Sequence, residues 1–226
     1  MTITLESTAS IELQPHCIVY GPAKSGKTRL IKTLSKPVIC NTDFGLGVIN
    51  DVQLPKYDCK KWDDVVKFMD WVRKGGAKEF SEIVFDDLTE MCQLYLDKAF
   101  RATSNAGNKA HGQQVYGAMA DEILAFIREV RQFDNCTVVL LCKESRIQDE
   151  NKRFVYAPMV PGRAVNPLLA YLVGQIYRMD TLVHEGKTHE CLRCKRTETY
   201  EAGDRSGKLH PTEQAHLGNI IAKVRS

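Results

Sequence analysis

The residues best placed to do chemistry form one loop, Gly21-Pro22-Ala23-Lys24-Ser25-Gly26-Lys27-Thr28, which matches the pattern G-x-x-x-x-G-K-[ST]. Residues 17–20 before the loop are apolar, as a buried strand is, and residues 28–34 after it are predicted to form a helix. Glycines let backbone N–H groups wrap a phosphate, and the amino end of a helix attracts negative charge. We therefore expect the stretch from Gly21 to Arg29 to bind ATP, with Lys27 on the β- and γ-phosphates and the Thr28 hydroxyl on Mg²⁺.

A carboxylate follows the apolar residues 83–85, where a second element of a phosphate-transfer site belongs. A strand that ends in an acidic residue supplies the Mg²⁺ side of P-loop NTPases, so Asp86 is predicted to hold the metal directly or through water. The neighbouring Asp87 either polarises water or caps the helix that follows. Both alternatives stay open at this point.

Two further polar side chains end predicted strands. Asp43 follows the apolar residues 37–41 and is the candidate general base that orients the attacking water, with a cap or turn role as the alternative. Lys143 follows residues 137–142, the most apolar segment of the chain, and is predicted to sense the γ-phosphate. Because parallel strands end at one edge of a sheet, these side chains are expected to meet the phosphate loop.

Length and composition indicate one compact domain over residues 1–226. The chain has 226 residues, 43% of them hydrophobic, and no apolar run approaches the roughly 20 residues of a membrane span. The amino terminus lacks the pattern of a secretory signal, and the eight cysteines are scattered, so we expect a cytoplasmic protein with reduced thiols. The net charge of +3 lies entirely in residues 187–226, a weak indication of a polyanionic partner.

Strand and helix patterns alternate along the chain. We predict short leading strands within residues 1–14, a helix with an apolar face from Trp62 to Val72, helices at 88–101 and 114–132, and a long polar segment at 144–165. Residues 177–183 and 190–200 form a predicted hairpin, and Thr212 is predicted to cap a last helix that ends near residue 222. The pattern predicts an α/β fold with a mostly parallel central sheet and flanking helices.

The order of these features resembles the RecA-like P-loop ATPase core, in particular the small phage-encoded members associated with single-strand annealing and recombination. The resemblance covers nearly the whole chain and rests most on residues 21–28, 81–86 and 199–209. It implies a homo-oligomer, a ring or a filament, in which Arg205 acts as an arginine finger on the nucleotide of the next subunit. Gly203 stands where the family has lysine, and Asp43 stands where it has glutamate, so the resemblance implies slow turnover.

The same resemblance implies that single-stranded DNA is the partner, with a single-strand DNA-binding protein as a further one. Two mobile loops of such proteins face the DNA, and here they correspond to residues 102–112 and 145–163. Their cationic and aromatic side chains, expected to neutralise phosphates and to stack on a base, are Arg101, Lys109, Arg146, Lys152, Arg153, Tyr156 and Arg163. An ordinary solvent-exposed loop is the alternative.

Cys191-Leu192-Arg193-Cys194 could supply two ligands to a metal, but a structural zinc site needs four, and no second pair follows, so packed or exposed thiols are expected. Two other functions remain open. One is a small-molecule kinase or another NTPase, although no Asn-Lys-x-Asp segment that would read guanine and no arginine-rich lid is present. The other is a nucleotide-gated DNA-binding protein with negligible turnover.

Overall fold

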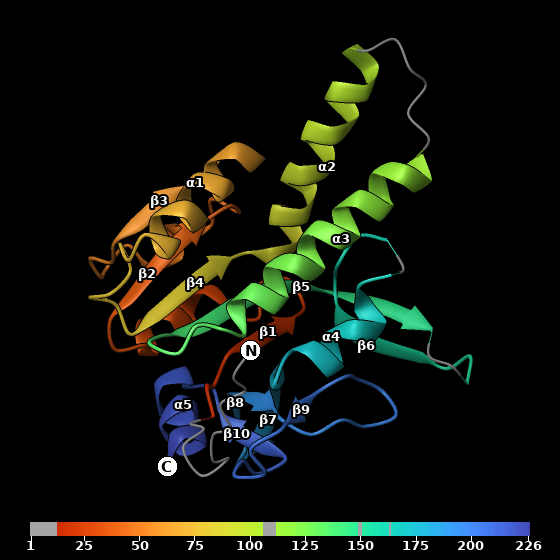
Figure 1. Cartoon of the computed structure of the whole chain (residues 1–226). Coiled ribbons are helices and arrows are strands. Elements are labelled where there is room, and N and C mark those ends of the chain that lie inside the picture. The colour runs from red at the N-terminus through yellow and green to blue at the C-terminus, as the bar shows by residue number, and fades with distance from the viewer. Residues whose placement is uncertain (1–12, 106–111, 149–150, 163) are drawn as a thin grey trace, which may run out of the picture.

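The computed structural model of the chain describes residues 13–105, 112–148, 151–162 and 164–226 (Figure 1). Its sheet is built on parallel strands that neighbour one another in the order β7-β1-β5-β4-β2-β3. These strands are β1 (Cys17–Gly21), β2 (Pro37–Asn41), β3 (Lys56–Asp58), β4 (Glu82–Asp86), β5 (Thr137–Gln148) and β7 (Gln175–His184). Strand β5 therefore lies between the strand that precedes the phosphate loop and the strand that ends in Asp86.

Antiparallel strands complete the sheet on the β7 side. Strand β8 (Lys187–Arg193) forms a hairpin with β7, β10 (Thr212–Gln214) pairs with β8, and β9 (Gly203–Asp204) pairs with the start of β7. This is the α/β RecA-like P-loop fold that the sequence predicts, with its hairpin in the carboxyl-terminal part.

Helices cover both faces of the sheet, because every residue of β1, β2 and β4 is buried and needs apolar neighbours on either side. Figure 1 shows α1 (Trp62–Arg73), α2 (Leu88–Asn105) and α3 (Gly112–Val130) on one face and α5 (Leu217–Arg225) on the other. Short 3₁₀ helices η2 (Thr28–Thr33) and η3 (Leu46–Ile49) belong to the α5 face.

An aromatic cluster fixes the end of β4. Phe85, directly before Asp86, is fully buried and meets Phe68 of α1 and Phe126 of α3 edge-on, at centroid separations of 5.8 and 5.0 Å. Each such pair contributes about 0.5–1.5 kcal/mol beyond the burial of area. The strand that carries the predicted metal ligand is thus held by α1 and α3.

Within the described residues of the polar segment at 144–165, two paired strands replace the mobile loop expected at 145–163, and that expectation was wrong. Strand β5 continues to Gln148 and pairs with β6 (Phe154–Pro158), and α4 (Asn166–Leu172) follows. Figure 1 shows the paired ends of β5 and β6 projecting from the body of the molecule. Alternation of side chains across this hairpin, with Val155 and Ala157 buried, hides the strand pattern among charged residues.

Three other expectations need correction at element boundaries. Thr212 does not cap the last helix, since it lies in β10, and the cap is His216, whose Nδ1 accepts a hydrogen bond from the Asn219 N–H at 3.1 Å. Residues 28–33 form a 3₁₀ helix, and β8 ends at Arg193 well before residue 200. The leading strands fall almost wholly on residues 1–12, outside the described residues. In the described part of the chain, every helix is too short or too polar to cross a membrane.

Close packing of α5 on η2 gives a test of this arrangement. A Cβ on Gly218 would come within 2.3 Å of the Thr33 carbonyl oxygen, at the end of the helix that follows the phosphate loop. We expect Gly218→Ala to lower the free energy of unfolding by about 1–3 kcal/mol, as overpacking does. Urea unfolding at equilibrium measures the change.

Gly117, in the middle of α3, is the matched control, because nothing lies within 4 Å of the position where its Cβ would be. Gly117→Ala should raise the free energy of unfolding by about 0.5–1 kcal/mol through helix propensity alone. A Gly218→Ala variant as stable as the Gly117→Ala variant would mean that α5 does not pack as described.

Candidate functional site

The phosphate loop leaves β1 at Gly21 in a conformation that demands glycine. Gly26 has a φ of +92°, and a Cβ on Gly21 would come within 2.7 Å of the Met179 Cβ in β7. The Ser25 hydroxyl is buried and has no hydrogen-bond partner among the described residues. Lys27 Nζ donates to the carbonyl oxygens of Gly21 and Pro22, each at 2.8 Å, so its ammonium group is held against the loop. An orphaned buried hydroxyl and a tethered cation fit a bound phosphate.

The two predicted metal-side residues meet beneath the loop. Thr28 Oγ1 donates to Asp86 Oδ2 at 3.3 Å, which joins the start of η2 to the end of β4. No group of three or more His, Cys, Asp or Glu side chains in the described ranges has the geometry of a metal site. The chain would thus supply two oxygen ligands, and Mg²⁺ commonly takes the rest of its shell from phosphates and water. The residues therefore fit Mg²⁺ bound together with a nucleotide.

Burial governs the charge of Asp86. Asp86 is only 3% exposed. Desolvation by burial raises the pKa of Asp86 to about 7, and the nearby carboxylates of Asp87 and Asp43 act in the same direction. Burial also lowers the pKa of Lys27, against the favourable charges of Asp87 and Asp86. A cation placed between Thr28 and Asp86 would favour the ionised carboxylate.

Of the two roles that the sequence left open for Asp87, the structure shows the capping of α2. Its Oδ1 accepts a hydrogen bond from the Glu90 N–H at 2.7 Å, in the first turn of α2. Burial, only partly offset by that hydrogen bond, raises the pKa of Asp87 to about 6. The Asp86–Asp87 peptide bond is cis.

Lys143 and Asp43, predicted separately, lie together. Strand register places Lys143 opposite Gly21, and its Nζ is 3.3 Å from Asp43 Oδ1. Backbone N–H groups of Thr42 and Asp43 donate to the Asp86 carbonyl at 2.7 and 3.0 Å, which ties the end of β2 to the end of β4. The structure thereby brings all four predicted catalytic residues of this edge, Lys27, Asp43, Asp86 and Lys143, to one place.

Glu90 belongs to the same cluster and was missed. Its carboxylate forms an ion pair with Lys143 Nζ, so Lys143 is shared between Glu90 and Asp43. Burial alone would lower the pKa of Lys143, but the hydrogen bond to Glu90 and the charges of Asp87 and Asp43 raise it. The spacing Asp87-x-x-Glu90 is a helix-start pattern, and it was the signal available in the sequence.

Arg205 lies near the amino end of β7, whereas the phosphate loop of the same chain follows the carboxyl end of β1. Gln175 faces both Cys17 and Asp204, and Cys17 precedes Gly21 by four residues, or about 13 Å of strand. Asp204 caps its own turn, with Oδ1 accepting from the Ser206 N–H at 2.9 Å. The exposed Arg205 donates from Nη2 to the Tyr171 carbonyl of α4 at 3.1 Å.

Four of the predicted DNA-contacting residues share the β5–β6 hairpin, namely Arg146, Lys152, Arg153 and Tyr156. The Arg146 guanidinium lies 4.5 Å from the ring centroid of Phe154, which is 56% exposed. Arg153 pairs with Glu198 at 3.2 Å. Arg101 is on α2, a separate element, whereas Lys109 and Arg163 fall outside the described residues.

A buried ion pair links the base of this hairpin to β7 and was also missed. Arg178 Nε donates to Glu144 Oε2 at 2.7 Å, and the Arg178 guanidinium lies 5.1 Å from the ring centroid of Tyr156. The hydroxyl of Tyr20, next to the phosphate loop in β1, donates to the Tyr156 carbonyl at 3.1 Å.

The two cysteines of the Cys-x-x-Cys segment, Cys191 and Cys194, are both buried.

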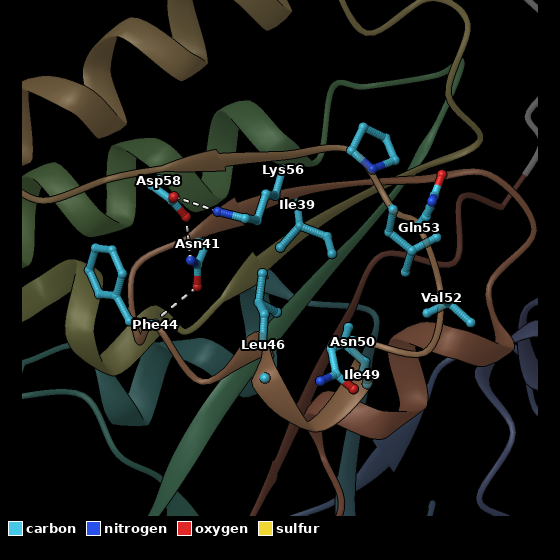
Figure 2. Close-up of a pocket in the computed structure, with 13 residues that line it drawn as sticks. Ile39, Asn41, Phe44, Leu46, Ile49, Asn50, Val52, Gln53, Lys56 and Asp58 are labelled. Carbon is cyan, nitrogen blue, oxygen red and sulfur yellow. Dashed lines mark hydrogen bonds and ion pairs between the residues drawn. The ribbon is translucent and has the colours of Figure 1, made fainter.

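A large hollow among the described residues lies beside the site and not in it. It has a volume of about 710 Å³ and opens between β2, β3 and η3, where Figure 2 shows Leu46 and Val52 near its apolar part. Asn41 closes one end, because its Nδ2 donates to Asp58 Oδ1 at 2.5 Å and its Oδ1 accepts from the Phe44 N–H at 3.1 Å. No residue of the phosphate loop lines it.

The raised pKa of Asp86 predicts how stability depends on pH in the absence of metal. Between about pH 4 and pH 7 the folded chain binds a proton at Asp86 that the unfolded chain releases, so stability falls as pH rises through this window. Asp86→Asn cannot ionise, and at pH 8 it should be more stable than the parent by about 1–3 kcal/mol. Thermal unfolding in EDTA at pH 5 and pH 8 measures this difference.

Added Mg²⁺ with nucleotide should reverse the order at pH 8, because only the parent can bind the cation at Asp86. Equal pH dependence of the parent and the Asp86→Asn variant, without metal, would contradict the assignment of the buried charge.

Of the comparisons with known proteins, the match to a protein family bears on this site. A comparison with curated protein sequences gives no significant match. Among solved structures, a KaiC-like protein from the hyperthermophilic archaeon Pyrococcus horikoshii has a TM-score of 0.41 and 10% identity, over 79% of this chain and 76% of its own, a level that supports no functional inference. The AAA domain, a P-loop ATPase domain, matches residues 14–206. That match spans most of the chain and includes the phosphate loop, Asp86 and Lys143, and this protein therefore belongs to the AAA domain family.

Proposed function

We propose that this chain is a Mg²⁺-dependent ATPase that assembles as a homo-oligomer on single-stranded DNA and serves phage homologous recombination by strand annealing or exchange. The observation that carries the nucleotide part is the contact of Thr28 Oγ1 with Asp86 Oδ2 at 3.3 Å under the tethered Lys27. The DNA and recombination parts rest on the resemblance and on the charged, aromatic hairpin beside Lys143.

Hydrolysis would use the residues at the edge of the sheet. Lys27 would move from the loop carbonyls to the β- and γ-phosphate oxygens, and Thr28 and Asp86 would hold Mg²⁺, which neutralises charge on the phosphates when bound. Asp43 would orient the attacking water and take its proton. Lys143, shared by Asp43 and Glu90, would meet the γ-phosphate on the same side of β1 as Thr28 and Asp86.

Arg205 would complete the site of a neighbouring subunit. Its position supports action in trans over action in cis, because it lies near Gln175, whose partner Cys17 stands about 13 Å of strand before Gly21. A cation that neutralises the transition state is commonly supplied by a second molecule in P-loop enzymes. A head-to-tail assembly places the Arg205 edge of one subunit on the phosphate-loop edge of the next.

The β5–β6 hairpin would contact DNA. It combines exposed Phe154 and Tyr156 with Arg146, which suits stacking on bases and neutralisation of phosphates without reading sequence. Strand β5 carries Lys143 at the base of the same hairpin, so nucleotide and DNA contacts lie on one continuous strand.

A nucleotide-gated binding protein with negligible turnover is the second candidate. Its support is the ion pair between Lys143 and Asp43, because this contact occupies a carboxylate oxygen that would otherwise accept a hydrogen bond from the attacking water. Strand annealing undiminished by a non-hydrolysable ATP analogue would favour this candidate. Phosphorylation of a small molecule, with no effect of single-stranded DNA on turnover, would favour a kinase instead.

Mixing two inactive variants tests the shared site. Lys27→Ala and Arg205→Ala should each lose most of the ATP turnover, because each removes one cation from every composite site. Mixed in equal amounts, they should recover about a quarter of the parent turnover, since that fraction of boundaries joins two intact halves. Phosphate release measured against mixing ratio gives the readout.

Recovery requires exchange of subunits, so the mixture is incubated at low protein concentration before nucleotide and DNA are added. A mixture as inactive as its components, in a preparation shown to be oligomeric, would place Arg205 outside the site.

The hairpin makes a separate prediction about salt. Arg146→Ala should weaken binding to an oligonucleotide and reduce the slope of log affinity against log salt by about 0.7, the value for one lost phosphate contact. Phe154→Ala should weaken binding by about 1–3 kcal/mol with the slope unchanged, since stacking releases no ions. Fluorescence anisotropy at several salt concentrations measures both.

Lys67, an exposed lysine on α1, is the control for general loss of positive charge. Lys67→Ala should leave affinity and slope as in the parent. Equal slopes for Arg146→Ala and the parent would remove the hairpin from the DNA interface.

A further inference from the structure

The side chains that suit the terminal phosphates and the metal lie on one side of β1. Thr28 and Asp86 meet on the side of β5 and β4, and Lys143 of β5 stands opposite Gly21 on that side. These residues suit the terminal phosphates and the metal. The nucleoside end of the ligand therefore leaves the phosphate loop away from them, and the neighbour of β1 on its other side is β7, with β8 next to it.

The β7–β8 hairpin lies directly against the phosphate loop. Met179 of β7 packs on Gly21, and the Glu190 Oε1 of β8 is 3.0 Å from the position that a Cβ on Gly26 would take. The same Oε1 forms an ion pair with Nη2 of Arg29, the residue that follows the loop motif. A polar pair thus stands at the loop on the side opposite the metal ligands.

The chemistry of this pair suits a neutral donor and not another phosphate. Glu190 alone would repel a triphosphate, but Arg29 neutralises it. A carboxylate has about four acceptor sites, so Glu190 keeps acceptor capacity beyond the one oxygen that Arg29 occupies. Hydroxyl groups of a ribose are donors of this kind, and acidic side chains bind ribose hydroxyls in dinucleotide-binding folds.

Both side chains are accessible to a ligand. Glu190 is 42% and Arg29 55% exposed, and an exposed ion pair holds its two members together only weakly. Either side chain can therefore shift toward a ligand at little cost in free energy. Because β8 pairs with β7 and β7 pairs with β1, the backbone of Glu190 stays near the loop while its side chain shifts.

We propose that Glu190 recognises the ribose of the bound nucleotide, so that the β7–β8 hairpin forms the nucleoside wall of the phosphate-loop site and selects ribonucleotides over deoxyribonucleotides. This rests on the nucleotide-binding part of the proposed function and is independent of DNA. Arg29 holds the carboxylate in place and offsets its charge.

Equilibrium binding tests this without any need for turnover. Isothermal titration with Mg²⁺ and ATP, 2′-deoxy-ATP or 3′-deoxy-ATP should show that the parent binds ATP about five- to tenfold more tightly than at least one deoxy analogue, as for one net hydrogen bond between exposed groups. Glu190→Ala and the more conservative Glu190→Gln should bind ATP and that analogue within about twofold of each other. Thermal unfolding of each variant verifies that it is folded.

Glu185→Ala is the matched control, since this acidic residue sits at the exposed turn of the same hairpin. It should keep the preference of the parent for ATP. A parent with no preference among the three nucleotides, or a preference that survives in both Glu190 variants, would overturn the proposal. A parent that prefers ATP, but whose ATP turnover does not change when single-stranded DNA is added, would instead count against the DNA part of the proposed function and leave the ribose contact standing.

Discussion

The pairing of β5 with both β1 and β4 is the constraint on which the rest of the molecule depends. Strand β5 lies between β1, which precedes the phosphate loop, and β4, which ends in Asp86, and all three strands are parallel. Parallel strands end at one edge, so Gly21, Lys143 and Asp86 meet there although about 60 residues separate each from the next. A slip of one residue in β5 would turn Lys143 away from Asp43 and bring Glu144 in its place.

That edge collects more negative than positive charge. The cluster has four carboxyl side chains, those of Asp43, Asp86, Asp87 and Glu90, and only two cations, Lys27 and Lys143, to neutralise them. Burial raises the pKa of Asp86 to about 7. Desolvated carboxylates that repel one another are a cost to the folded chain, and a divalent cation with its phosphates relieves it. In the proposed function, part of the free energy of nucleotide binding would come from relief of this repulsion, so that binding would stabilise the fold.

Contiguous sequence patterns predicted the phosphate loop and the strand that ends in Asp86. The features that were missed depend on pairing between distant segments of the chain. The loop from Gly21 to Thr28 and the strand ending in Asp86 are contiguous signals, and the structure placed them as predicted. The β5–β6 hairpin was missed because charged side chains alternate with buried Val155 and Ala157, which lowers the apolar signal of a strand. Glu190 could not be found, since its place beside Gly26 depends on how β8 folds back along β7.

Strand β5 also explains how one side of the site can be linked to the hairpin. Successive residues of a strand face opposite ways, so Lys143 turns to Asp43 while Glu144 turns to Arg178. Both side chains of the Glu144–Arg178 pair are at least 86% buried, since they are 10% and 14% exposed. A buried pair adds little net stability, but removing one partner strands the other charge, so its main effect is to fix geometry. Lys143 and the Glu144–Arg178 pair are thus neighbours on one strand, and the pair lies against the ring of Tyr156 at the base of the hairpin.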